Sequence, residues 1–230
     1  MREIVLDTET TGFDPLKDDR IVEIGAVELS GRLPTGRHFH IYLNPERDVP
    51  EDAERVHGLS TSFLADKPVF AQEVDRFLEF IGDAPLVIHN ASFDMSFINA
   101  ELTRCGFPAL AQNRAIDTLA MARQKFPGAP ASLDALCKRF DIDLSARTFH
   151  GALLDAQLLA GVYLELCGGR QPDLDMSTQE KTEQTAEDAA HQNRPFHPPR
   201  PHAPTEEELA AHTAFLETLK TPLWKRKEGA

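Results

Sequence analysis

Cysteine, long apolar runs and positive charge are all scarce in this chain of 230 residues. The three cysteines, Cys105, Cys137 and Cys167, are widely spaced and match no C-x-x-C zinc pattern, so neither a disulfide framework nor a zinc site is expected. No apolar run approaches the ~20 residues of a membrane-spanning helix. Residues Met1 to Glu3 lead directly into a predicted strand, without the apolar stretch of a signal peptide. Together these absences predict a cytoplasmic protein with free thiols.

The balance of charge is strongly acidic. The 24 lysines and arginines are outnumbered by 37 aspartates and glutamates, which gives a formal net charge of −13. A protein that coats nucleic acid by neutralising many phosphates would be basic, so this class is excluded. An enzyme that grips a few phosphates through bound metal ions stays possible, because the ions reverse the local field.

Short β-branched runs and amphipathic segments fill residues 1–170 and predict one folded domain. Strands are predicted at 4–6, 20–29, 37–43 and 86–89, and helices at 50–56, 70–81, 117–124, 132–139 and 150–167. Residues 90–92 lead into a further helix that runs through residue 104. Three strands, a helix, a strand and then mostly helices indicate an α/β domain with a mixed sheet and helices on both faces.

The composition changes after residue 170. Residues 171–204 are rich in Pro, Gln, Glu, His and Thr and are almost devoid of large apolar side chains, which predicts a flexible, disordered linker. Thr205 and Glu208 then form a capping-box pattern ahead of a short helix with apolar residues at helical spacing. A helix this short is marginal alone, so it is either a frayed tail or a segment that docks its apolar face on a partner. We favour docking, because the helix has no core of its own.

Two carboxylates, Asp7 and Glu9, follow the apolar run Ile4, Val5 and Leu6, which predicts a buried strand. Because strand side chains alternate between faces, both carboxylates point to the same face. Like charges held this close repel and raise each other's pKa unless a shared proton or a divalent cation offsets them. Oxygen ligands suit Mg²⁺ or Mn²⁺. Taken alone, the pair is equally consistent with a solvated strand end.

Two aspartates and a histidine stand at the starts of later helices. Asp94 lies two residues into the helix that follows the 86–89 strand, where the helix dipole alone would favour a carboxylate. Asp155 lies among apolar neighbours, where a ligand role fits better than an unpaired buried charge. His150 suits a general base, since its pKa can lie near the working pH. Four carboxylates and this histidine predict a hydrolase in which two ions, ~3.5–4 Å apart, clamp an in-line phosphoryl displacement.

The three segments that carry these residues resemble the three ordered motifs of the DEDDh 3′–5′ exonucleases. They are 7–12 (Asp-Thr-Glu-Thr-Thr-Gly), 89–94 (His-Asn-Ala-Ser-Phe-Asp) and 150–156 (His-Gly-Ala-Leu-Leu-Asp-Ala). More closely, the chain is similar to the proofreading epsilon subunits of bacterial DNA polymerase III over nearly all of residues 1–170. The resemblance implies a ribonuclease H-like fold with a mixed five-stranded sheet, and removal of mispaired 3′-terminal nucleotides as 5′-mononucleotides.

The resemblance also implies a cofactor and its ligands. Two Mg²⁺ or Mn²⁺ ions are expected in one site. The metal ligands of the family match Asp7, Glu9, Asp94 and Asp155, and its general base matches His150.

Substrate contacts are implied as well. His57 matches the family's contact to the terminal nucleotide, and Asp52 stands where relatives usually carry a glutamate that helps to hold substrate. The metal-binding carboxylates Asp7, Glu9 and Asp155 are expected to contact the substrate too.

The resemblance implies two protein partners. Residues Thr205–Ala230 are expected to dock on the polymerase catalytic (alpha) subunit. Residues Gln171–Met176 stand where epsilon subunits bind the sliding clamp, and they keep the glutamine, a leucine and a terminal apolar residue but lack the usual aromatic side chain.

Two alternatives stay open at this point. An RNA-trimming exoribonuclease would use the same chemistry and would be distinguished by selection for the 2′-hydroxyl, which no residue here indicates. A catalytically silent polymerase scaffold would carry the acids without using them, and would release no products from single-stranded DNA with Mn²⁺.

Overall fold

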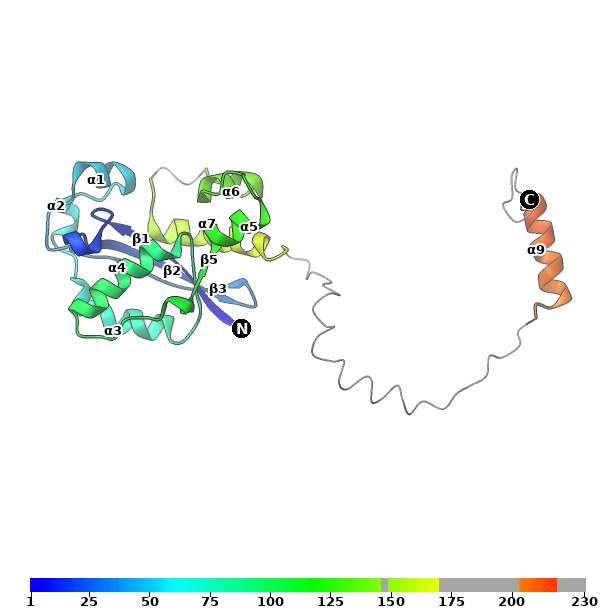
Figure 1. Cartoon of the computed structure of the whole chain (residues 1–230), viewed down its shortest axis with the longest axis horizontal. Helices are drawn as coiled ribbons and strands as arrows, with labels where there is room; N and C mark the ends of the chain where they lie inside the picture. Colours follow the sequence, from blue (N-terminus) through cyan, green and yellow to red (C-terminus); the bar gives the residue numbers. More distant parts are fainter. Residues whose placement is uncertain (146–148, 170–202, 219–230) are drawn as a thin grey trace, which may run out of the picture. The chain divides into compact units, whose positions relative to one another are not determined.

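The computed structural model describes residues 1–145, 149–169 and 203–218. The chain divides into two compact units, Met1–Asp173 and Leu174–Ala230. The first unit contains β1 (Arg2–Thr10), η1 (Pro15–Lys17), β2 (Ile21–Ser30), β3 (Leu33–Tyr42), α1 (Glu51–His57), α2 (Thr61–Leu64), α3 (Phe70–Ile81), β4 (Leu86–Ile88), α4 (Ala91–Arg104), η2 (Gln112–Arg114), β5 (Ala115–Asp117), α5 (Thr118–Lys125), α6 (Leu133–Arg139) and α7 (Ala152–Leu166) (Figure 1). The second unit contains α9 (Glu206–Thr218).

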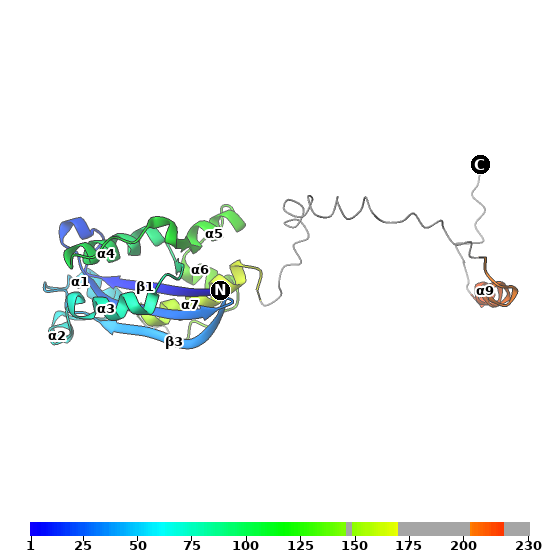
Figure 2. The ribbon, with the colours of Figure 1, turned by 90° about the horizontal axis from the view of Figure 1, so that it is seen from below.

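The sheet of the first unit has five strands in the order β3-β2-β1-β4-β5. The pairings β1–β2 and β2–β3 are antiparallel, whereas β1–β4 and β4–β5 are parallel. Figure 2 shows β1 and β3 running in the same direction, as the antiparallel pairing of each with β2 requires. The prediction of a mixed five-stranded sheet is therefore confirmed.

Alternation along β1 sends its side chains into two separate cores. Ile4 and Leu6 join the core that contains residues of α3 and α4, whereas Val5 joins the core that contains residues of α5, α6 and α7. The helices therefore cover both faces of the sheet, as predicted. Because Asp7 and Glu9 continue the odd-numbered series, they follow Val5 toward the face that α7 covers.

Most predicted elements lie within a few residues of the observed ones, and the 70–81 helix has the predicted bounds. The third strand begins at Leu33, whereas the prediction began at residue 37. The first half of this strand is exposed and carries no apolar pattern, so no sequence signal indicated it. The two 3-10 helices η1 and η2 were not predicted, and neither were two other short elements. These two others are β5, with three residues, and α2, a single turn of four.

A close approach between β2 and α7 depends on Gly25. Gly25 lies opposite Asp7 in the β1–β2 ladder. A Cβ atom at this position would lie 2.1 Å from the backbone nitrogen of Leu153 and 2.2 Å from the backbone carbon of Ala152. Only glycine therefore lets the first turn of α7, which carries Asp155, rest directly on the strand.

The second unit is described through α9. Its first turn is closed by the predicted capping box: the backbone N–H of Glu208 donates to Thr205 Oγ1 (3.3 Å), and the backbone N–H of Thr205 donates to Glu208 Oε2 (2.8 Å). Leu209 and Phe215 are 51% and 59% exposed on this helix. The predicted linker and clamp segment fall almost wholly in residues 170–202, and the end of the tail in 219–230, outside the described residues.

Among the described residues, none of the helices has the length and apolar character needed to cross a membrane.

We expect Gly25→Ala to lower the thermal stability of the protein, because the added methyl group meets backbone atoms that cannot rotate away. Overpacking of this kind costs about 1–3 kcal/mol, which corresponds to a fall in Tm of roughly 3–10 °C for a domain of this size. Thermal unfolding followed by circular dichroism measures the change. Gly151→Ala is the matched control, since its Cβ meets nothing within 4 Å and its φ of −143° suits any residue. Equal melting temperatures for wild type and Gly25→Ala would contradict the close approach.

Candidate active site

The site begins where β1 loses one of its two neighbouring strands. Pairing with β4 is recorded only at Ile4 and Val5. The first turn of α4 takes the place of the missing strand: Asp94 Oδ1 accepts hydrogen bonds from the backbone N–H (3.1 Å) and the hydroxyl (2.7 Å) of Thr8. Asp94 is 3% exposed. The buried carboxylate of Asp94 is thereby fixed beside the segment of β1 that carries Asp7 and Glu9.

The pKa values show that the four predicted carboxylates share one region. The pKa of Asp7 is raised well above its usual value, first by burial and then by the negative charges of Asp94, Glu9 and Asp155. Burial raises the pKa of Asp94 to about 7, although its hydrogen bonds from Thr8 act in the opposite direction. The structure therefore brings together four acids from three distant segments, and their mutual repulsion calls for a cation.

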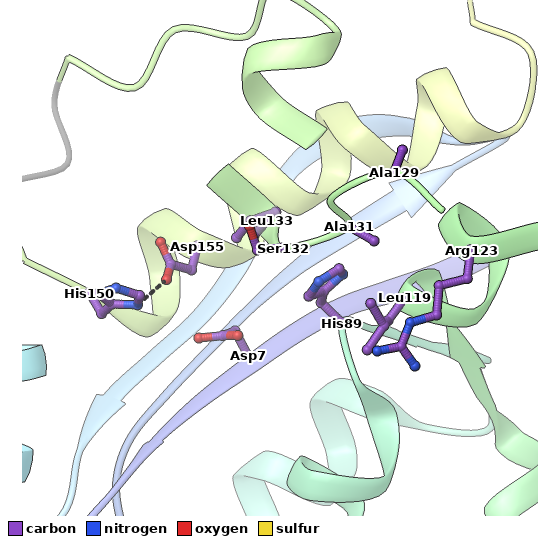
Figure 3. A pocket seen from close by; sticks show the side chains of 10 residues that line it. All are labelled: Asp7, His89, Leu119, Arg123, Ala129, Ala131, Ser132, Leu133, His150 and Asp155. Carbon is purple, nitrogen blue, oxygen red and sulfur yellow. Dashed lines mark ion pairs between the residues drawn. The ribbon is translucent and has the colours of Figure 1, made fainter. Parts of the chain in front are cut away.

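Glu9, His150 and Asp155 form the tightest part of this group. Each offers a ligand atom, and these atoms lie within 4.8 Å of one another. His150 Nδ1 lies 3.5 Å from Asp155 Oδ2, the pair marked by the dashed line in Figure 3. The backbone N–H of His150 donates to the Val56 carbonyl (3.1 Å), which ties the histidine to α1. Carboxylate oxygens with one imidazole suit a divalent cation.

Two cavities open beside the acid cluster. Asp7, Asp155 and His150 line a cavity of about 520 Å³ that also exposes His89 and Arg123 (Figure 3). A second cavity, of about 510 Å³, opens beside Glu9. Its lining includes Thr8, Glu9, Thr10, Thr11, Gly12, Asp52, His57 and Phe93. Asp7 thus lines one cavity and Glu9, two residues later on β1, lines the other.

His57 and Asp52 both reach the second cavity from α1, but in different settings. His57 is 5% exposed, and its Nδ1 accepts a hydrogen bond from the backbone N–H of Leu59 (3.0 Å). Its Nε2 is buried and has no hydrogen-bond partner among the described residues, and burial lowers the pKa of the ring. The Asp52 side chain is 91% exposed and forms an ion pair with Arg55. The substrate roles of both residues stay predictions.

Four residues of this region carried no role in the sequence analysis. Thr8 lies between the two acids of β1, and alternation alone would have placed its hydroxyl on the α4 face, beside Asp94. Phe93 was part of a motif without a role of its own. His89 and Arg123 line the first cavity, and an exposed arginine on a helix gives no sequence signal.

Comparison with known proteins defines the class first. The exonuclease family model (RNase_T) matches residues 4–163. The solved structure of Exonuclease X in complex with 5′ overhanging duplex DNA aligns with a TM-score of 0.55 and 25% identity, covering 71% of this chain and 90% of that one. The fold and motifs are those of a ribonuclease H-like exonuclease, so the predicted fold class is confirmed.

Two relatives narrow the class further. DNA polymerase III subunit epsilon of Rickettsia felis is 52% identical over 224 residues, covering 95% of this chain and 97% of the relative. The protein of the same name from Escherichia coli K12 is 45% identical over 228 residues, covering 95% and 93%. The chain belongs to the family of DNA polymerase III epsilon subunits. The prediction of a proofreading 3′–5′ exonuclease is thereby confirmed, whereas the roles of individual site residues stay predictions.

We expect the metal-free protein to lose stability as pH rises, because folded Asp94 holds its proton to about pH 7 while its usual pKa is 3.8. The folded state binds more protons than the unfolded state between these values, so this contribution to unfolding free energy falls through that window. Asp94→Asn stays neutral and escapes the loss. Its Tm relative to wild type should therefore rise by several degrees between pH 5 and pH 8 in EDTA.

Calorimetry at a series of pH values measures this difference, and taking it relative to wild type cancels the titration of groups that do not interact with Asp94. Mg²⁺ should narrow the gap at pH 8 by stabilising the ionised wild-type site. A gap that stays constant with pH would contradict the assignment of the raised pKa to Asp94.

Proposed function

We propose that this chain is the proofreading subunit of a bacterial replicative DNA polymerase and removes mispaired 3′-terminal nucleotides from DNA as 5′-mononucleotides. The observation that carries the proposal is the convergence of Asp7 with the carboxylates of Glu9, Asp94 and Asp155, and with His150 beside them. The name shared by the relatives supports the polymerase context and favours DNA over RNA as substrate. Such a subunit works in the bacterial cytoplasm, where replication takes place.

The donor set suits two Mg²⁺ or Mn²⁺ ions. Asp7, Glu9, Asp94 and Asp155 supply hard oxygen ligands. Burial raises the pKa of both Asp7 and Asp94, and neighbouring carboxylates raise that of Asp7 further, so bound cations would stabilise the ionised forms. When bound, two such ions stabilise the charge that develops on the attacking and leaving oxygens of an in-line displacement. The carboxylates of the chain hold the ions, and Gly25 allows Asp155 to come close enough to take part.

His150 is assigned as the general base. Its side chain is about half exposed, at 51%, so water reaches it, and its Nδ1 is turned toward Asp155. A carboxylate beside Nδ1 orients the ring. Nε2 is then the nitrogen that takes the proton from the attacking water.

The second cavity is assigned to the terminal nucleotide. Because His57 Nδ1 accepts a hydrogen bond, the neutral ring carries its proton on Nε2, which becomes a donor for substrate. Phe93 adds an aromatic surface, and Asp52 lies at the exposed side of the same cavity. A mispaired end costs less to unpair, so it enters such a cavity sooner than a paired one.

The parts of the chain are assigned as follows. Residues 1–170 form the exonuclease domain, 171–204 a flexible linker with a clamp contact at Gln171–Met176, and 205–230 the segment that docks on the polymerase catalytic subunit. Leu209 and Phe215 support the last assignment, because they expose large apolar surface on α9. The linker and clamp assignments rest on sequence alone.

We expect Asp7→Ala to lose metal-dependent release of 5′-mononucleotides while keeping the fold. Removing one preorganised electrostatic contact in an active site typically lowers kcat roughly 10²–10³-fold, and we expect at least this loss. Release from single-stranded DNA with Mn²⁺ is measured beside circular dichroism. The control is Asp75→Ala, an exposed aspartate on α3. Unchanged activity in Asp7→Ala would refute the site, and an inactive wild type would favour the silent-scaffold alternative.

Deletion of residues 205–230 should spare hydrolysis and abolish co-purification with the polymerase catalytic subunit. Hydrolysis survives because every predicted site residue lies in the first compact unit. Co-expression and affinity purification with full-length and shortened chains measure the association. Leu209→Glu combined with Phe215→Glu, on the exposed side of α9, should have the same effect without shortening the chain. Retention of the polymerase by the shortened chain would refute the docking assignment.

A further inference from the structure

The first cavity has an acidic end and a cationic end. Figure 3 shows Asp7, Asp155 and His150 toward one end and Arg123 toward the other, with His89 between them. Its volume of about 520 Å³ lies within the ~300–1,000 Å³ range typical of ligand sites. The proposed chemistry uses the acidic end only, so the cationic end is left without a function.

Arg123 is the only arginine or lysine among the ten residues that line this cavity. It lies on α5 and is exposed, and no carboxylate of the described residues forms an ion pair with it. Several other arginines of the domain are paired with carboxylates, as Arg20 is with Glu101 (2.6 Å). His89 does not supply the charge, because burial lowers its pKa below the usual value and keeps the ring neutral at pH 7. An unpaired guanidinium facing a cavity suits a phosphate ligand.

The direction of the substrate strand follows from the two cavities. Hydrolysis divides the strand into the departing nucleotide and the retained strand, with the scissile phosphate at the carboxylates. The second cavity, with His57 and Phe93, suits a nucleoside. The retained strand then leaves through the first cavity, where its next phosphate meets Arg123.

We propose that Arg123 binds the phosphate of the retained strand that lies one linkage upstream of the scissile phosphodiester. This inference rests on the proposed function and adds a phosphate subsite to it. The contact matters because a chain of net charge −13 offers little general attraction for DNA. This phosphate does not change during the reaction, so Arg123 strengthens ground-state and transition-state binding equally and affects KM rather than kcat.

Arg123→Gln is tested on two substrates that differ by this phosphate. A single-stranded trinucleotide contains the upstream phosphodiester, and a dinucleoside monophosphate contains only the scissile one. With the trinucleotide, KM should rise roughly 5- to 20-fold, the loss expected for one exposed charge-assisted contact, with kcat unchanged. With the dinucleoside monophosphate, wild type and variant should be equal. Arg76→Gln, an exposed arginine on α3, is the matched control.

A neutral methylphosphonate at the upstream linkage identifies the atom group involved. Wild type should lose the same factor on this trinucleotide as Arg123→Gln loses on the natural one, and the variant should show no further loss. The proposal would be overturned if the KM of Arg123→Gln rose by the same factor on the dinucleoside monophosphate as on the trinucleotide. It would also be overturned if the KM on the trinucleotide did not rise.

Binding without turnover separates this proposal from the proposed function. Fluorescence anisotropy of a labelled single-stranded oligonucleotide, with Ca²⁺ replacing Mg²⁺, should show the same fold loss in Arg123→Gln. The slope of log affinity against log salt should become shallower by about 0.7. If wild type hydrolyses none of these substrates, the proposed function fails. The ratio of the oligonucleotide affinities of wild type and Arg123→Gln still decides whether Arg123 binds a phosphate. Equal affinities of the two proteins would refute the proposed phosphate contact.

Discussion

The hydrogen bonds between Thr8 and Asp94 are the contacts on which the site depends. The short strand β4 leaves the end of β1 without a parallel neighbour, and an unpaired buried N–H is costly. Asp94 accepts that N–H at 3.1 Å, so a side chain from α4 completes the ladder. The short length of β4 therefore decides where the Asp94 carboxylate pairs with β1 and becomes part of the site.

The cluster concentrates negative charge in a buried region. The pKa of Asp7 is raised by four other carboxylates, those of Asp94, Glu9, Asp155 and Glu23, and Asp94 is buried deeply enough to hold a proton to about pH 7. Such an arrangement weakens the metal-free fold and is retained where function requires it. A bound cation, rather than a rearrangement of side chains, would relieve the repulsion among these carboxylates. The backbone positions of the acids are fixed by β1 and by the first turns of α4 and α7.

The sequence indicated the strongly periodic elements and the acids at their ends. The 70–81 helix has a clear apolar stripe, and the alternation after Val5 places Asp7 and Glu9 on one face. The sequence did not indicate contacts between segments that are distant along the chain. Nothing local marks Gly25 as the residue beneath α7, β5 is too short to show a period, and Arg123 has the pattern of any solvated helix position. Single-sequence patterns report burial and period, whereas cavities arise from the meeting of distant segments.

Asp94 and Asp155 approach the site from opposite sides of the sheet. The helix that carries Asp94 packs on one core, and the helix that carries Asp155 packs on the other. Cations bound by both carboxylates would link the helices on the two faces of the sheet directly to each other. Cofactor loading would then stiffen the whole exonuclease body, so that catalytic competence and mechanical rigidity arrive together.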